Sequence, residues 1–316
     1  MSIKGSSGKI KTEAALPIFL VFAVIAAALR LYQYFTIIET DTGFFSEENF
    51  TVPLLYGILA VAGVLIFVIT YLAKKVPLST LPEGKSIPLA IAGSIFSLSF
   101  LIDAAIQFYS CTVISSATGS MEYLTSSGAI SYLFKSGMAP KGLEAFFALL
   151  SAVYFLIFAI KFFGASVSVQ NRKILAVMPV FWATARMLQR FTRTISIIYV
   201  SDLLLELFMI AFMMMFFLSF AQLASNVNSR HVVNKIYAYG LIGALLAAVV
   251  AVPRLVVLIV EPSRIVSNDP LEICDIGYLI FAVVLCCEMI KMPTEDNITL
   301  KEVEKLQKEH EQQEEN

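Results

Sequence analysis

Ionisable side chains inside otherwise apolar segments are the residues of this sequence best placed to do chemistry. Seven of them stand out: Arg30, Asp103, Arg186, Arg190, Glu206, Arg254 and Asp275. An ionisable group in the apolar interior of a membrane costs at least about 2.5 kcal/mol, so it usually faces a cavity or an opposite charge. The arginines outnumber these carboxylates, and a guanidinium binds a carboxylate or phosphate through two parallel hydrogen bonds. The sequence therefore predicts a binding site for a small anion.

Glutamines share helix faces with these charges. Residues three and four apart lie on one face of a helix. That spacing joins Arg30 with Gln33, Asp103 with Gln107, and Arg186 with Gln189 and Arg190. The pattern favours one of two structures, which the sequence leaves open. One is a polar pocket, and the other is a closed network of ion pairs that only holds the helices together.

The charges gather in one half of the apolar segments. With a rise of about 1.5 Å per residue, Arg30 and Arg186 lie roughly 20 Å from the beginning of their segments. Asp103 lies at a similar depth, and Glu206 and Asp275 come early in segments that run in the opposite direction. This one-sided distribution predicts that a pocket would open toward a single face of the membrane.

The elements that carry these residues are apolar runs of membrane-spanning length. They cover residues 16–38, 53–73, 87–110, 143–163, 174–193, 203–223, 236–260 and 271–290. Runs near 20 residues cross a bilayer as helices, because each backbone polar group must be paired within the segment. The chain is 58% hydrophobic and 15% charged. We expect an all-α, polytopic bundle of about eight membrane-spanning helices, in which the last is weakest because Asp275 interrupts its start.

One transmembrane domain, 16–290, accounts for most of the chain. The segment 1–15 precedes it, and a charged tail, 291–316, has the pattern of a short amphipathic helix. Lys and Arg concentrate in alternate loops and in both terminal segments, which predicts cytoplasmic N- and C-termini and a multi-pass protein of the cell membrane. Residues 110–142 form a long outer loop, interpreted either as a lid or as a surface segment.

The first and fifth segments share a local motif, R-x-x-Q-x-F-T, which begins at Arg30 and at Arg186. The two copies lie four segments apart along the chain, so a duplication would give a 4+4 parallel repeat. The other pairs of segments show little similarity.

Known catalytic motifs are missing from the sequence. Zinc-protease, nucleophile-elbow, Walker A and kinase patterns are absent, and His231 and His310 lie outside the apolar segments. An enzyme is therefore the less favoured interpretation, and we expect no metal and no cofactor. The net charge of −1 gives no reason to expect nucleic-acid binding.

Three functions remain open from the sequence. The first is a transporter- or permease-like protein with an outward-facing polar pocket for a small, anionic solute. The second is a non-catalytic sensor, scaffold or complex subunit whose buried charges serve helix packing. The third is an intramembrane enzyme. The expected partners are the lipid bilayer, the solute and, for the charged tail, another protein.

Overall fold

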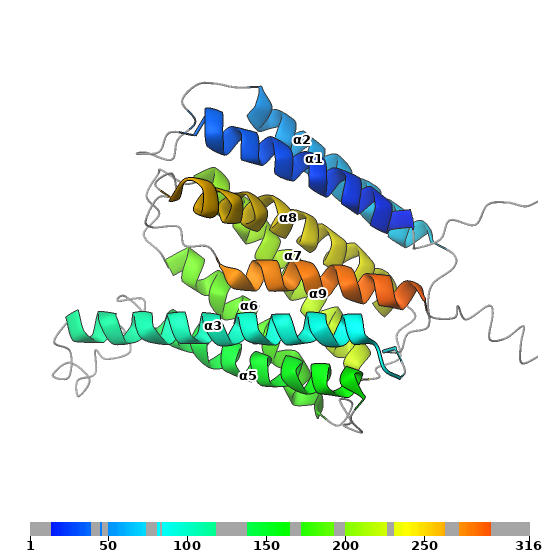
Figure 1. Cartoon of the computed structure of the whole chain (residues 1–316), viewed down its shortest axis with the longest axis vertical. Helices are drawn as coiled ribbons and strands as arrows, with labels where there is room; N and C mark the ends of the chain where they lie inside the picture. The colour runs from blue at the N-terminus through cyan, green and yellow to red at the C-terminus, as the bar shows by residue number, and fades with distance from the viewer. Residues whose placement is uncertain are drawn as a thin grey trace, which may run out of the picture.

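A computed structural model describes the helical part of the chain. The described residues are 14–38, 45, 50–73, 81–82, 84–117, 138–164, 172–192, 200–225, 231–262 and 272–291. Within them lie eight helices and no strand longer than an isolated bridge. The helices are α1 (Ala15–Thr36), α2 (Thr51–Leu72), α3 (Ile87–Ala117), α5 (Met138–Phe163), α6 (Lys173–Thr192), α7 (Val200–Ala224), α8 (Val232–Val260) and α9 (Ile273–Ile290). Figure 1 shows them side by side in one bundle.

Seven of these helices are long and apolar enough to cross a membrane, and α6 is the exception. The sequence predicts eight spans with α9 as the weakest, and that ranking is wrong. Helix α6 is less apolar than the other seven helices because Arg186, Gln189 and Arg190 all fall in its second half. It nevertheless lies inside the bundle between α5 and α7, with Trp182 and Ala183 fully buried.

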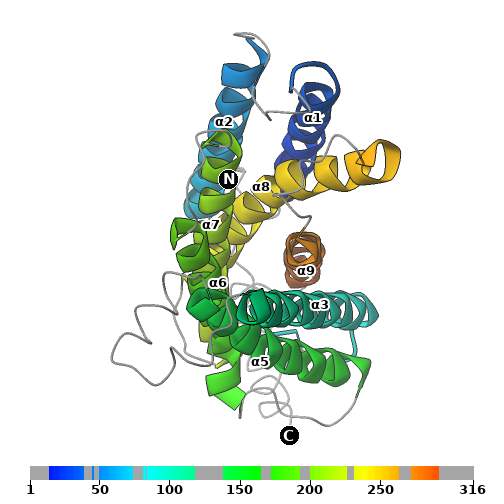
Figure 2. The same ribbon diagram turned by 90° about the vertical axis from the view of Figure 1, so that its left-hand side faces the viewer.

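Six helices form a closed ring. Helix α3 packs on α5, α5 on α6, α6 on α7, α7 on α8, α8 on α9, and α9 packs back on α3. Helices α1 and α2 form a hairpin that packs on α8, outside this ring. Figure 2 looks roughly along the bundle and shows α9 between α8 and α3, with the hairpin beyond α8. The ring gives the molecule an interior that side chains from six helices can reach.

Aromatic side chains fill the middle of the ring. This aromatic core consists of Phe96, Phe100, Phe155, Phe158, Trp182, Phe216, Phe217, Phe220, Tyr278 and Phe281, all fully buried. The ring centroid of Phe96 lies 4.6 Å from that of Phe155, 5.4 Å from that of Phe281 and 6.0 Å from that of Phe217. Tilted and offset contacts of this kind stabilise packing beyond the area they bury. The aromatic core therefore closes the ring interior between its two ends.

Several element boundaries differ from the predicted ones. Helix α3 continues to Ala117 and α5 begins at Met138, so the loop predicted over 110–142 is much shorter. Its centre, 118–137, lies outside the described residues, as do the charged tail beyond 291 and the first 13 residues. Helix α1 begins and α9 ends at the same end of the bundle, on the right of Figure 1.

Candidate functional site

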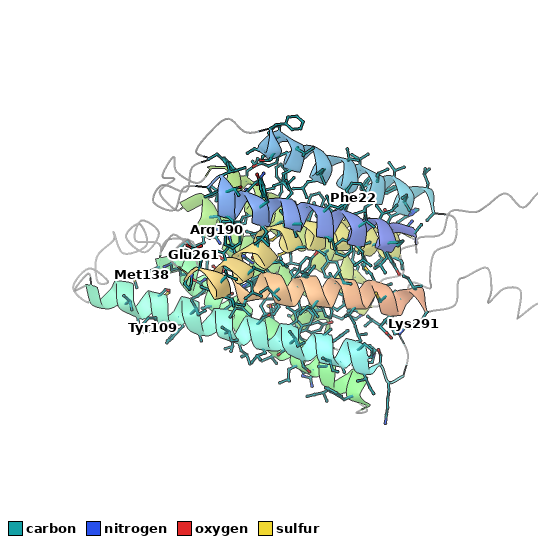
Figure 3. The ribbon with its side chains drawn as sticks, turned by 45° about the horizontal axis from the view of Figure 1, so that its top comes forward. Phe22, Tyr109, Met138, Arg190, Glu261 and Lys291 are labelled. Carbon is teal, nitrogen blue, oxygen red and sulfur yellow. The ribbon has the colours of Figure 1, made fainter. Side chains whose placement is uncertain are left out.

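Ionisable side chains from all six ring helices meet toward one end of the bundle. This charged layer consists of Asp103 from α3, Glu144 from α5, Arg186 and Arg190 from α6, Glu206 from α7, Arg254 from α8, and Glu272 and Asp275 at the start of α9. It lies where α6 and α8 end and where α5, α7 and α9 begin. Figure 3 labels Arg190 at this end and Lys291 at the opposite end.

Arg186 is held by two carboxylates. Its Nη1 donates to Asp275 Oδ1 at 2.7 Å and its Nη2 donates to Asp275 Oδ2 at 3.0 Å, a bidentate pair. It also forms an ion pair with Glu272. The guanidinium carbon lies 5.3 Å from the ring centroid of Trp182, and the side chain is only 1% exposed. Both terminal nitrogens of the guanidinium are therefore engaged by carboxylates at the start of α9, whereas its Nε has no hydrogen-bond partner among the described residues.

Further ion pairs extend from this contact across the ring. Arg190 pairs with Glu272 and, at 3.2 Å, with Glu206 Oε2. The other oxygen of Glu206 accepts a hydrogen bond of 2.6 Å from Arg254 Nη1. The resulting ion-pair chain runs Asp275–Arg186–Glu272–Arg190–Glu206–Arg254. It links α9, α6, α7 and α8, two of which, α6 and α9, are not adjacent in the ring.

Arg30 lies on α1, outside the ring, and its contacts differ from those of the arginines in the ion-pair chain. Its Nη1 donates to Gln33 Oε1 at 2.9 Å, and Gln33 Nε2 donates to the carbonyl of Thr51 at 2.9 Å. The guanidinium also lies over the Tyr34 ring, 5.0 Å from its centroid. Arg254 Nε donates to the Tyr34 hydroxyl at 3.4 Å, which connects Arg30 to the ion-pair chain through one tyrosine.

The two copies of the R-x-x-Q motif thus make different contacts. Gln33 binds the arginine of its own helix, whereas Gln189 donates across to Gln107 Oε1 of α3 at 3.3 Å. Arg186 binds an aspartate, whereas Arg30 donates a hydrogen bond to an amide and lies over the ring of Tyr34. The shared motif therefore does not carry a shared role in the two helices.

Asp103 accepts hydrogen bonds from neutral side chains. Trp182 Nε1 donates to its Oδ2 at 2.8 Å, and Gln107 Nε2 approaches its Oδ1 at 3.4 Å. The sequence leads us to expect an arginine at both Asp103 and Glu206. Glu206 forms ion pairs with two arginines. Asp103 is close enough to Arg186 to interact with it electrostatically, but its hydrogen bond from Trp182 joins the charged layer to the aromatic core.

Two carboxylates of the charged layer escape sequence reasoning, Glu272 and Glu144. Each is the second residue of a predicted apolar segment, where a charged side chain usually extends to the membrane surface. Glu272 bridges Arg186 and Arg190. Glu144 is 0% exposed, and neither carboxylate oxygen has a hydrogen-bond partner. The only sequence signal is an acidic residue slightly inside the segment end.

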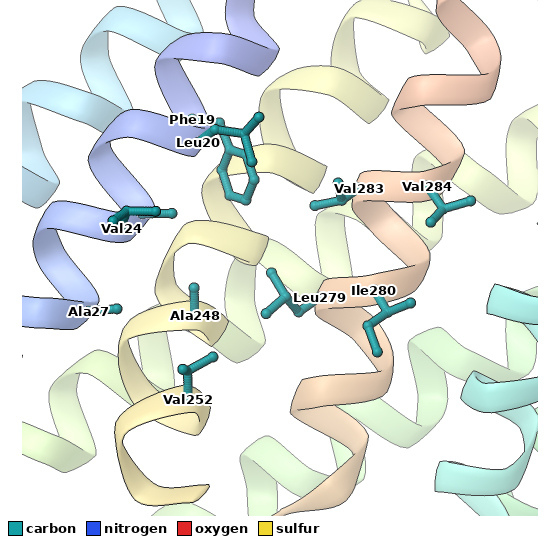
Figure 4. A pocket seen from close by; sticks show the side chains of 11 residues that line it. Phe19, Leu20, Val24, Ala27, Ala248, Val252, Leu279, Ile280, Val283 and Val284 are labelled. Carbon is teal, nitrogen blue, oxygen red and sulfur yellow. The ribbon is translucent and has the colours of Figure 1, made fainter. Parts of the chain in front are cut away.

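An apolar groove lies between α1, α8 and α9, away from the charged layer (Figure 4). Its volume is about 440 Å³. The side chains that line it are Phe19, Leu20, Ala23, Val24, Ala27, Ala248, Val252, Leu279, Ile280, Val283 and Val284. All are apolar, and Leu20 and Val24 are exposed on the bundle surface. This groove does not have the chemistry of the polar pocket that the sequence predicts.

Metal-binding chemistry finds no support in the part of the chain that the structure describes. Within it, no group of three or more His, Cys, Asp or Glu side chains could hold a metal ion. The carboxylates of the charged layer instead meet guanidinium groups.

The fold defines a class of protein. A bundle with seven helices long and apolar enough to span a bilayer is that of a multi-pass integral membrane protein in contact with lipid. No protein-family model matches the chain, and neither the curated proteins nor the solved structures contain a match to it. The functional argument therefore rests on the geometry of the charged layer and the aromatic core.

Proposed function

We propose that this protein is transporter- or permease-like, with a translocation route along the axis of the six-helix ring. One observation carries the proposal. Each of the six ring helices contributes an ionisable side chain to a single layer of the interior. Ionisable groups that face the inside of a membrane bundle mark solute, ion and proton pathways. A bundle that needs only to be stable would be served by apolar packing.

The route is closed in this conformation at two levels. The ion-pair chain joins helices across the charged layer, and the aromatic core fills the ring below it. Packed interfaces and salt-bridge networks rearrange between discrete states, and such changes accompany transport and gating. We propose that the ion-pair chain is a gate that opens when its carboxylates exchange an arginine for a solute.

The charge balance favours a positively charged solute. The arginines that motivate the anion hypothesis meet carboxylates, and Arg186 meets two. Glu144 and Glu272 add to the negative side of the layer. An incoming cation or proton would relieve this excess, whereas an anion would increase it. The charged layer therefore suits a cationic solute better than the anionic solute expected from the sequence.

We also propose which side of the membrane the gate faces. The Lys and Arg distribution favours cytoplasmic termini. In agreement with this, the beginning of α1 and the end of α9 lie at the same end of the bundle. In this orientation the charged layer faces the outside of a cell membrane. Solute would then enter from the outer side.

A second function is favoured by the closure of the ion-pair chain. A scaffold, sensor or complex subunit would use the same contacts to hold α6, α7, α8 and α9 in place. Buried polar groups can fix which helices pair, even where they add little stability. This alternative requires no opening of the layer and no solute.

Charge movement separates the two functions. The protein would be reconstituted in liposomes on a solid-supported membrane and exposed to rapid jumps of H⁺, Na⁺, choline and lactate. A transporter of positive charge should give a transient current with a cation or with H⁺, and lactate should give none. Protein-free vesicles are the control. If a folded protein gives no current with any of the four, the transport proposal is wrong; a lactate current alone would restore the anion hypothesis.

A further inference from the structure

Glu144 has no evident structural role in the closed conformation. It lies in the second turn of α5, its side chain is 0% exposed, and both carboxylate oxygens lack a hydrogen-bond partner. Glu206 and Asp275, by contrast, each meet a guanidinium within 3 Å. Burying an ionised carboxylate without partners is far more costly than burying a neutral carboxylic acid. The position therefore requires a neutralising ligand.

None of the charged groups around Glu144 hydrogen-bonds to its carboxylate. They are Asp103 from α3, Arg186 and Arg190 from α6, and Lys141 on its own helix. Both arginines are already engaged with the carboxylates at the start of α9. Asp103 adds a negative charge nearby. An ionised Glu144 would therefore face a like charge, two arginines engaged with other carboxylates, and Lys141, which does not hydrogen-bond to it.

Among the described residues of the charged layer, with Arg30 added because it is connected to Arg254 through Tyr34, carboxylates outnumber guanidiniums by one. Its acidic members are Asp103, Glu144, Glu206, Glu272 and Asp275, and its basic members, with Arg30 included, are Arg30, Arg186, Arg190 and Arg254. These five carboxylates and four guanidiniums balance when one monovalent cation is added. In the described residues no cluster is suited to a metal ion. A proton is the cation that needs no further ligands.

We propose that Glu144 is a proton-binding site, protonated in this closed conformation and deprotonated when the charged layer opens to water. On opening, the O–H bond of the carboxylic acid breaks, its electron pair stays on the carboxylate oxygen, and the proton passes to water. This proposal rests on the proposed function only for the release step. The protonated resting state is a property of the closed protein alone.

Infrared spectroscopy of the full-length protein in a detergent without ester groups reads the protonation directly, because the ester carbonyls of phospholipids absorb in the same region as a carboxylic acid. A protonated carboxylic acid has a carbonyl stretch that an ionised carboxylate lacks. We expect this band in the wild type at neutral pH, its loss in Glu144→Gln, and a shifted band in Glu144→Asp. The matched control is Glu288→Gln in α9, because Glu288 accepts a hydrogen bond from Lys291 at the opposite end of the bundle. That variant should keep the band.

The outcomes separate the proton site from the transport proposal. A wild type without the band, or a band that Asp103→Asn removes and Glu144→Gln does not, would overturn the proton site. If Glu144→Gln does not fold, the Glu144→Asp shift still decides the question, and an unshifted band is contrary evidence. A Glu144 band without any charge movement would leave the site standing and remove transport. Charge movement without the band would leave the transport proposal standing and remove the proton site.

Discussion

Glu206 holds two arginines on one carboxylate, which makes it the residue whose loss should matter most for stability. Its oxygens meet Arg254 at 2.6 Å and Arg190 at 3.2 Å. Glu206→Gln removes the charge that both guanidiniums face. Breaking a buried ion pair by neutralising one partner costs about 3–5 kcal/mol. We expect a loss of that size in the free energy of unfolding, measured by denaturant titration in mixed micelles.

Asp103→Asn is the matched comparison, because Asp103 lies in the same layer but is bound by neutral donors. An asparagine carbonyl oxygen can still accept the Trp182 Nε1–H, so the variant should cost about 1 kcal/mol. If Asp103→Asn destabilised the protein as much as Glu206→Gln, our assignment of the ion-pair chain would be mistaken.

Residue types and their spacing predict most members of the charged layer, but not which arginine pairs with which carboxylate. Arg186, Arg190 and Glu206 stand out because charges are rare in apolar segments. The sequence alone does not show which helices are neighbours, so it cannot match each arginine to a carboxylate. Glu144 and Glu272 are missed for another reason. A charge near a segment end can reach water in a helix that faces lipid, and only the packing shows that Glu144 is buried and that Glu272 bridges two arginines.

Helix α6 shows how far the apolar pattern predicts an element. The predicted span, 174–193, nearly coincides with the observed helix, Lys173–Thr192. Its limited apolarity follows from its position, because its polar face is turned into the ring and bonds to α3 and α9. The ends of α3 and α5 are predicted less well, since both helices continue past their most apolar residues.

Close packing of α9 on α3 depends on Gly277. A Cβ atom at this position would lie 2.4 Å from Ser99 Oγ and 2.9 Å from Phe96 Cδ2. Gly277→Ala should therefore push α9 away from the aromatic core and cost about 1–3 kcal/mol, as overpacking does in well-filled interiors. The measurement is the midpoint of thermal unfolding in detergent.

The matched control for this substitution is Gly63→Ala in α2. No atom lies within 4 Å of a Cβ built there, and alanine favours a helix over glycine by up to about 1 kcal/mol. That variant should be as stable as the wild type or slightly more so. Equal stability of the two alanine variants would count against the close approach of α9 to α3.

The whole molecule divides into a six-helix ring and a two-helix hairpin. The predicted 4+4 repeat would place the division between α5 and α6, and it stays a prediction because contact between these two helices is compatible with it. The sequence predicts the class of fold because apolar length is a local property. It does not predict the ring, which depends on contacts such as that between α9 and α3, far apart in the chain.

Topology is testable with cysteines at the two ends of the bundle. In a background where the four native cysteines are replaced by alanine, Phe50→Cys and Lys291→Cys both introduce exposed positions, since the native side chains are 75% and 67% exposed. With eight crossings and cytoplasmic termini, a membrane-impermeant thiol reagent should label Phe50→Cys in intact cells and leave Lys291→Cys unlabelled until the cells are opened. Labelling of Lys291→Cys from outside, with Phe50→Cys protected, would mean that the bundle has the opposite orientation in the membrane.

The most direct test of the account is a pH jump applied to wild type and Glu144→Gln in liposomes on a solid-supported membrane. The account makes Glu144 the proton carrier of a closed but openable charged layer. It predicts a transient current for the wild type and for Gly63→Ala, and none for Glu144→Gln, although that variant should unfold at a temperature close to that of the wild type. An equal current in Glu144→Gln, or no current in the wild type, would contradict it.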